Sequence, residues 1–369
     1  MTDVAVASTA FTARLLAQLA GPGANTVCSP LSAQVALTLV ALGARGETRT
    51  ELEHVLGAPT QELTGDVADL GARLAEIQDP ATARLASGVW TAPSARPRPE
   101  YCSEVERELG AAVGELDPSD AAALDRSRAR INAWAAERTA GRITELLNEQ
   151  QLTTQTLMVL VSALHLRGPW PEPLRRDEAA FTLADGTTVT VPMLHGIAGG
   201  WYADKHASAT ALRTRGGALS LVLVRPTTGV DDVLAAWAAD PSALENLLAG
   251  VREGQGGVQL AVPPLEVAWG ADLTEPLRAL GLERTLSPGA DLTGMLEGPG
   301  GVGAVVQKAV LSLDEHGMEA AAATAAIALR GAPAPPRHEL SLDVPFLLLA
   351  CEGSTGLPLI AGRIEDPRA

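Results

Sequence analysis

The chain has 369 residues, of which 46% are hydrophobic, enough for a substantial core in a single domain that spans residues 1–369. Its formal net charge of −16 argues against nucleic acid and anionic membranes as partners. No run of about 18 apolar residues marks a membrane span. The chain has three cysteines, Cys28, Cys102 and Cys351, and a small, odd number of cysteines does not indicate a disulfide framework.

The N-terminus, MTDVAVASTAFTARLLAQLA, lacks a basic segment and an uninterrupted apolar core. We therefore expect no signal peptide and favour the cytoplasm over secretion. Lysine occurs only at Lys205 and Lys308, whereas arginine, alanine and glycine are frequent. We interpret this bias as the mark of a GC-rich, prokaryotic genome.

The first elements along the chain are predicted to be helices. Residues Phe11–Ala20 form a short amphipathic pattern. Ser29 is a suitable N-cap with Pro30 at the first helical position, and the helix that follows is apolar nearly all round, which indicates burial. A further helix is expected over Thr48–Leu56.

The middle of the chain alternates strand and helix patterns. Leu157–Leu166 is a continuous apolar run, typical of a strand buried on both faces. The other expected strands are Leu85–Trp90, Thr188–Leu194, Leu219–Val224 and Gly257–Leu265. The other expected helices are Tyr101–Leu109, most of Asp231–Leu248, and a short one from Leu273 to near Gly281.

A strand-like segment, Val305–Glu315, leads into an alanine-rich run, Met318–Arg330. Composition alone favours a helix there, because alanine is the best helix former. The run also contains no proline, so every backbone N–H in it could donate to a sheet. Both interpretations are open from the residues themselves.

The sequence gives little support for dinucleotide binding, nucleophilic catalysis or metal binding. Gly298–Gly303 satisfies G-x-G-x-x-G but precedes a strand, which is the wrong context for a dinucleotide. Gly353–Gly356 reads as a hairpin turn and not as a nucleophile elbow. The six histidines show no metal-ligand spacing. We therefore expect no metal, no cofactor and no enzymatic activity.

Three stretches resemble the serpin family: NTVCSPLSAQVALTLVALGARGETRTELEHVLG, GADLTGM, and VVQKAVLSLDEHGMEAAAATA followed by VPFLLLACEGSTGLPLIAGRIEDP. The resemblance extends over about residues 11–367. It implies an α+β serpin fold with a large central sheet, mostly antiparallel or mixed, about nine helices and two further sheets. The segment at about 315–337 would then be an exposed reactive-centre loop.

The resemblance implies a suicide inhibitor that acts as a monomer. A serine protease attacks the loop and forms a covalent acyl-enzyme, and the loop then inserts into the central sheet. The hinge suits insertion, because after Met318, which replaces the usual Thr or Ser, it contains small side chains and no proline. The hinge residues are Glu315, Gly317, Met318, Glu319, Ala320, Ala321, Ala322 and Ala323.

The resemblance also makes Arg126–Leu147 the helix that lies across the main sheet, and it assigns roles to residues at the opening of that sheet. Trp170 matches the tryptophan where the loop enters, called the breach. The polar cluster called the shutter maps to Ser29, Ser32, Ser162 and Gln307, where the family usually has two serines, an asparagine and a histidine. Ordinary core packing for Trp170 and helix capping for Ser29 are the alternatives. We expect the substitutions to change how readily the sheet opens.

The scissile bond is predicted between Arg330 and Gly331. Family spacing from Glu315 places the bond after Gly331, or after Arg330 if the spacing is one residue shorter. Counting back from Phe346 points further on, near Pro333–Ala334. Arg330 offers a cation to a trypsin-like protease. Leu329–Arg330 is the runner-up, for a chymotrypsin- or subtilisin-like target. A non-inhibitory binding protein or a plain protease substrate is the alternative function.

Overall fold

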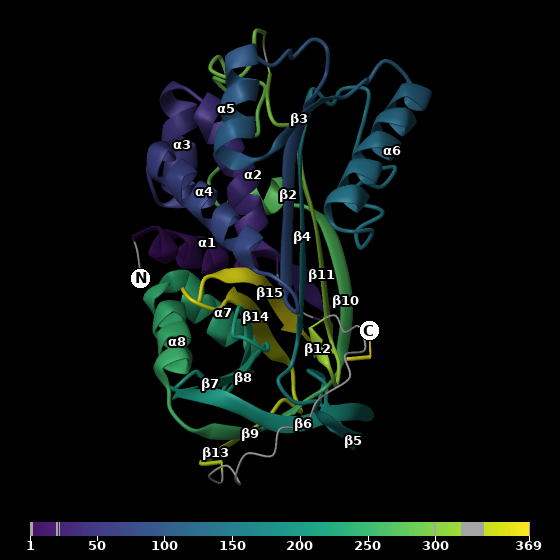
Figure 1. The fold of residues 1–369 in the computed structure, drawn as a ribbon. Coiled ribbons are helices and arrows are strands. Elements are labelled where there is room, and N and C mark those ends of the chain that lie inside the picture. The colour runs from purple at the N-terminus through teal and green to yellow at the C-terminus, as the bar shows by residue number, and fades with distance from the viewer. Residues whose placement is uncertain (1–2, 20, 22, 299, 319–335, 369) are drawn as a thin grey trace.

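The computed structural model describes residues 3–19, 21, 23–298, 300–318 and 336–368. A long sheet runs the length of the molecule, with helices α2–α5 on one side of its upper half and α6 on the other (Figure 1). The helices in these ranges are α1 (Asp3–Leu19), α2 (Pro30–Gly43), α3 (Gly46–Leu56), α4 (Thr60–Glu76), α5 (Pro99–Leu109), α6 (Ala121–Arg138), α7 (Val230–Ala239), α8 (Ser242–Glu253) and α9 (Thr274–Ala279).

The long sheet has six strands and mixed direction. Its order is β10–β11–β12–β4–β2–β3, and β11 also pairs with β4 in parallel. The pairs β10–β11, β11–β12, β12–β4 and β4–β2 are antiparallel. The strands are β2 (Thr82–Thr91), β3 (Ala112–Glu115), β4 (Met158–Pro169), β10 (Leu265–Asp272), β11 (Ala304–Leu313) and β12 (Gly317–Met318).

A second sheet of nine strands fills the other half of the molecule (Figure 1). Its order is β1–β15–β14–β8–β7–β6–β9–β13, and β5 pairs with β6 beside this path. The two further sheets that we expected are continuous here through the long strand β6. The strands are β1 (Thr26–Cys28), β5 (Arg175–Thr182), β6 (Thr188–Ala203), β7 (Ala207–Arg213), β8 (Leu219–Pro226), β9 (Gly257–Val262), β13 (His338–Ser341), β14 (Phe346–Glu352) and β15 (Pro358–Ile364).

The central strand β4 is buried on both faces, as its sequence predicted. Leu164 and Leu166 point into the main core, whereas Val159 and Val161 pack under α6. Burial of nonpolar side chains on both faces supplies the main favourable free energy of folding for such a strand. The predicted α+β class with a large mixed sheet is confirmed.

Several element bounds differ from the predictions. The predicted helix Arg126–Leu147 begins earlier, at Ala121, and ends at Arg138, because Ala140 and Gly141 adopt positive φ angles of 55° and 80°. Asp231–Leu248 divides into α7 and α8 between Asp240 and Pro241. The predicted Phe11–Ala20 helix is the second half of α1, and α4 was not predicted at all.

Three findings concern the excluded functions. No described helix is both long and apolar enough to span a bilayer. Within the described residues, no three His, Cys, Asp or Glu side chains gather in a way that could hold a metal. Cys28, Cys102 and Cys351 are all free thiols, and burial raises the pKa of Cys28 to about 12.

Candidate functional site: the hinge and the opening of the long sheet

A tight turn connects β11 to β12. Asp314 Oδ1 accepts hydrogen bonds from the backbone N–H groups of His316 (2.6 Å) and Gly317 (3.1 Å), and Asp314 N donates to Gly317 O (3.1 Å). An aspartate at the first position of a turn commonly binds the backbone two residues ahead in this way. The turn therefore reverses the chain so that it can run back between β11 and β4.

Met318 already lies between these two strands. Gly317 is opposite Pro169 and Met318 is opposite Gly168 on β4, while Met318 is also opposite Leu313 on β11. The Met318 side chain is fully buried in the main core. A Cβ atom on Gly317 would come within 2.5 Å of Gly168 O, so this close approach requires glycine.

Trp170 holds the turn from the side of β4. Its backbone N–H donates to His316 O (2.8 Å) and its indole Nε1 donates to Asp314 O (3.1 Å), and its side chain is 2% exposed. The predicted breach residue thus contacts the hinge directly through both its backbone and its ring.

Glu315 is held at the surface of the turn. Its carboxylate pairs with Arg176 on β5 at 3.1 Å, and its carbonyl accepts from Leu174 N (2.7 Å). A backbone hydrogen bond and the Arg176 guanidinium lower the pKa of Glu315. An ion pair with both members partly exposed contributes little to stability, so its role is mainly to fix the geometry.

Three of the four predicted shutter residues form one hydrogen-bonded cluster. Gln307 Oε1 accepts from Ser29 N (2.8 Å), and Gln307 Nε2 donates to Ser29 O (2.5 Å) and to Ser32 Oγ (2.8 Å). Ser29 Oγ caps α2 by accepting from Ser32 N and donates to Leu359 O (2.7 Å). Capping and contact with β11 are therefore compatible roles for Ser29.

Ser162, the fourth predicted shutter residue, is hydrogen-bonded to a residue outside this cluster. It is opposite Gln307 in the β11–β4 register, yet its hydroxyl bonds the Ser87 hydroxyl on β2 at 3.0 Å. A serine hydroxyl is too short to reach Gln307 from this position, whereas an asparagine amide could extend toward it. Ser87 was not predicted, because a lone serine in a strand carries no sequence signal that separates it from any other small residue.

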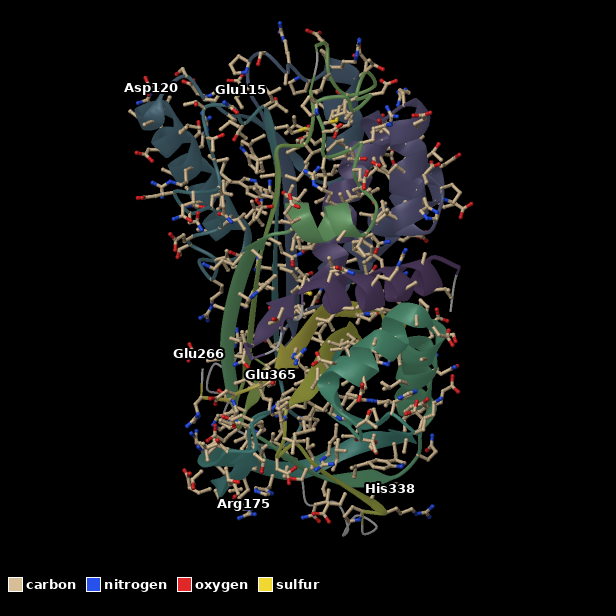
Figure 2. All side chains as sticks on the ribbon, turned by 180° about the vertical axis from the view of Figure 1, so that it is seen from behind. Glu115, Asp120, Arg175, Glu266, His338 and Glu365 are labelled. Atoms are coloured by element: carbon tan, nitrogen blue, oxygen red, sulfur yellow. The ribbon has the colours of Figure 1, made fainter. Side chains whose placement is uncertain are left out.

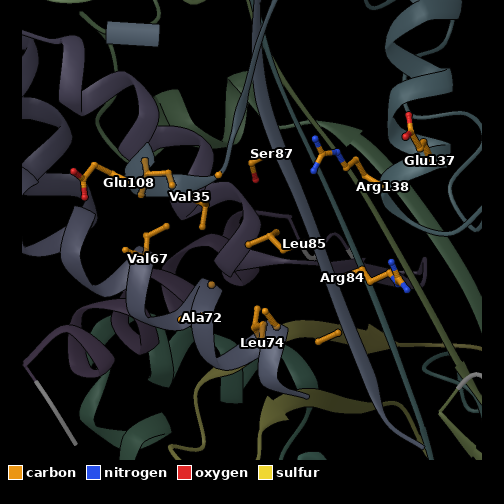
Figure 3. A pocket seen from close by; sticks show the side chains of 16 residues that line it. Val35, Val67, Ala72, Leu74, Arg84, Leu85, Ser87, Glu108, Glu137 and Arg138 are labelled. Atoms are coloured by element: carbon orange, nitrogen blue, oxygen red, sulfur yellow. The ribbon is translucent and has the colours of Figure 1, made fainter. Parts of the chain in front are cut away.

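A cavity of about 540 Å³ lies beside Ser87 along the edge of β2 (Figure 3). β2 pairs with β3 only from Gly88 onward, so its first half is a free edge of the sheet. Apolar side chains of α4 and β2 line the cavity, including Val67, Leu74 and Leu85. The cavity therefore separates this edge of β2 from part of α4.

Cations gather on the outer face of the sheet, which α6 covers in part. His165 on β4 is 4% exposed, and Arg84 is its opposite residue on β2. Burial, and then Arg142, Arg84 and Arg167, lower the pKa of His165 to about 4. Neither Arg84 nor Arg167 forms an ion pair with a carboxylate in the described part of the chain.

The segment after α6 crosses the same face and is tied down on both sides. Asn132 Oδ1 accepts from Leu146 N and Leu147 N at 2.9 and 2.8 Å. Lys308 Nζ on β11 donates to Glu145 O at 2.6 Å. The segment is therefore hydrogen-bonded to α6 and to β11, and it packs against apolar side chains of β4 and β11.

The remaining predicted site residues, Glu319, Ala320, Ala321, Ala322, Ala323, Leu329, Arg330 and Gly331, lie outside the described residues. The chain resumes beside β9, where His338 stacks on Trp201 with ring centroids 4.5 Å apart. His338 and Arg175 mark one pole of the molecule, and Glu115 and Asp120 mark the opposite pole (Figure 2).

Comparisons with known proteins agree along the whole chain. The family model for serpins, described as serine protease inhibitors, matches residues 6–367. The leukocyte elastase inhibitor of Bos taurus is 30% identical over 384 residues, covering 100% of both chains, and Serpin-ZXA of Oryza sativa subsp. japonica is 30% identical, covering 97% of this chain and 96% of that protein.

Solved structures show the same fold. The thermophilic serpin Tengpin in its native state aligns with a TM-score of 0.88 at 19% identity, covering 99% of this chain and 95% of that one. AtSerpin1 of Arabidopsis, solved in its native stressed conformation, aligns with a TM-score of 0.87 at 26% identity, covering 100% of both chains.

Proposed function

The chain belongs to the serpin family, and from this we propose that it inhibits a serine protease as a suicide substrate. In this mechanism a monomer is cleaved in its reactive-centre loop, stays attached to the protease as an acyl-enzyme, and inserts the loop into the long sheet. The observation that carries the proposal is the position of Met318, buried between β4 and β11 with strands paired on both sides.

The pairing of β12 fixes the register of any further insertion. Gly317 and Met318 run antiparallel to Pro169 and Gly168, so each step forward along the loop is one step back along β4. Continued in this register, Glu319 comes opposite Arg167 and Ala328 opposite Met158, the far end of β4. Met158 pairs with Thr91, which pairs with Glu115 near the opposite pole.

In this register the side chains of the loop would face compatible residues of β4 and β11 on both faces of the sheet. Directly opposite residues in an antiparallel pair share one face. Glu319, the single charged residue between Met318 and Arg330, meets Arg167 on the outer face. Thr324, the single hydroxyl in the run 320–328, meets Ser162 on β4 and Gln307 on β11. The alanines between them need little space.

Insertion also improves the backbone pairing. In the present state β4 and β11 are parallel neighbours over Val159–His165 and Ala304–Val310. A loop strand between them would replace this one parallel ladder with two antiparallel ones, and antiparallel pairing is slightly more stable per residue. The gain is available only after cleavage frees the loop, so the intact protein is held in a kinetically trapped state.

For the target, we favour a trypsin-like protease that cleaves between Arg330 and Gly331. The arginine suits the acidic specificity pocket of such enzymes. Cleavage at Leu329–Arg330 by a chymotrypsin- or subtilisin-like protease is the second candidate. The bovine and porcine relatives are named leukocyte elastase inhibitors, which points away from an arginine-specific target.

Incubation with trypsin, chymotrypsin and elastase tests both assignments. We expect trypsin to form an adduct that survives a denaturing gel, together with a released peptide whose first residue is Gly331. A peptide that begins at Arg330 would favour the second candidate. Complete cleavage without an adduct for every protease would show a plain substrate or a non-inhibitory binding protein.

A further inference from the structure

A second cavity, of about 590 Å³, lies away from the hinge, among α1, α2, α4 and the turn between β14 and β15. Leucine and valine side chains form its apolar wall: Leu31, Leu63, Val67, Leu70 and Leu357. Its volume is within the range of small-molecule sites, which combine an apolar wall with a few polar groups.

The base of this cavity holds a polar group with unused hydrogen-bonding capacity. Gln34 on α2 is 3% exposed, and one end of its amide bonds the Ser8 hydroxyl. The other end of the amide forms no hydrogen bond with a described residue, although it belongs to a side chain that lines the cavity. A buried amide group normally finds a partner, so this one is suited to a polar atom of a ligand.

The α4 side of the rim carries two aspartates together with Arg73. Asp66 and Asp69 both line the cavity, and neither forms an ion pair within the described residues. Partial burial raises the pKa of Asp66, with Asp69 and Glu62 adding to the effect and Arg73 opposing it. A cation placed between the two carboxylates would relieve their mutual repulsion.

The opposite rim is already occupied by internal contacts. Arg252 Nη1 donates to Thr355 O at 2.6 Å, and Arg252 Nη2 donates to Glu253 Oε1 at 3.4 Å. Arg252 therefore has less capacity left for an anionic ligand than the two aspartates have for a cationic one. Arg73 also lines the cavity and opposes the effect of Asp69 on Asp66, so a positive group on the ligand would be drawn to the two aspartates and not to the cavity as a whole.

We propose that this cavity binds a hydrophobic amine, with its apolar body against Leu63 and Leu70, its ammonium group between Asp66 and Asp69, and a polar atom near the Gln34 amide. The site shares no residue with the hinge or with the polar cluster around Gln307. Binding there is a separate property from protease inhibition, and either can fail without the other.

Two fluorescent probes that differ in one group test the proposal. Both carry a dansyl group on a five-carbon chain, which ends in a primary amine in one probe and in a carboxylate in the other. We expect saturable one-to-one binding of the amine probe, with a rise in fluorescence, and binding of the carboxylate probe that is about tenfold weaker or absent.

The variants assign the effect to Asp66. Asp66→Asn keeps the shape of the side chain and is expected to weaken binding of the amine probe about tenfold. Glu76→Gln removes a charge from the same helix outside the cavity and should change binding less than twofold, and thermal unfolding confirms that both variants fold. Equal affinity for both probes, no saturable binding of the amine, or unchanged binding by Asp66→Asn would overturn the proposal.

Discussion

Gln307 on β11 and Ser29 at the start of α2 are joined by two hydrogen bonds, one in each direction: Ser29 N donates to Gln307 Oε1 at 2.8 Å, and Gln307 Nε2 donates to Ser29 O at 2.5 Å. Both residues are buried, at 1% and 0% exposure. This pair ties β11 to the helix beneath it at the place where the sheet is proposed to open.

Removing the Gln307 amide should weaken this tie strongly. Gln307→Ala leaves the buried N–H of Ser29 without its acceptor, at a cost of roughly 1–3 kcal/mol, whereas the Ser29 carbonyl keeps the bonds from Ala33 N and Ser32 Oγ. We expect a lower unfolding temperature and a shorter half-life of inhibitory activity on warming. Gln259→Ala, on an exposed position of β9, is the control and should behave as the wild type.

Ser162→Asn tests whether the separated serine changes how easily the sheet opens. An asparagine amide is longer than the serine hydroxyl and can reach toward Gln307 across the strand gap. We expect a longer thermal half-life for the variant. Ser87→Ala, which removes the present partner of Ser162, should shorten it. Identical half-lives for all three proteins would show that this pair does not control opening.

The proposed register predicts an ion pair between Arg167 and Glu319 in the cleaved protein. Arg167→Gln and Glu319→Gln should each lower the unfolding temperature of the cleaved protein more than that of the intact one. The two effects should not add in the double variant, because either change alone removes the same pair. Full additivity in a double-mutant cycle on cleaved protein would show that the loop inserts in another register, or not at all.

His165 predicts a pH dependence of the intact protein. Its folded-state pKa of about 4 lies below its ordinary value of 6.5, so the unfolded state binds more protons in this window. Stability should therefore fall as the pH is lowered from about 6.5 to 4, by up to about 3 kcal/mol. His165→Gln should flatten this part of the curve, whereas His54→Gln, at an exposed site on α3, should leave it unchanged.

The sequence was sufficient for the fold because it carried strong local signals. The Ser29–Pro30 cap, the apolar run of β4 and the order of the family stretches were each visible without coordinates. The bounds of α6 were missed because Ala140 adopts a left-handed conformation that alanine rarely takes. No local sequence pattern predicts this conformation of Ala140.

Contacts between distant segments could not be predicted. Nothing near Arg176 indicates that β5 brings it to Glu315, and nothing near Ser87 indicates that β2 brings it to Ser162. Asp314 was not predicted as a site residue, although its side chain organises the turn between β11 and β12. These residues depend on strand register, which is fixed by the packing of the whole sheet.

The most direct test compares thermal unfolding of the intact protein with that of a sample cleaved in the loop. We predict that the cleaved protein unfolds at a clearly higher temperature, because the freed segment becomes a strand between β4 and β11. Cleaved Ala322→Pro should lose most of this increase, since proline cannot donate to the ladder. A cleaved wild-type protein that unfolds at the same temperature as the intact one would contradict the proposed mechanism.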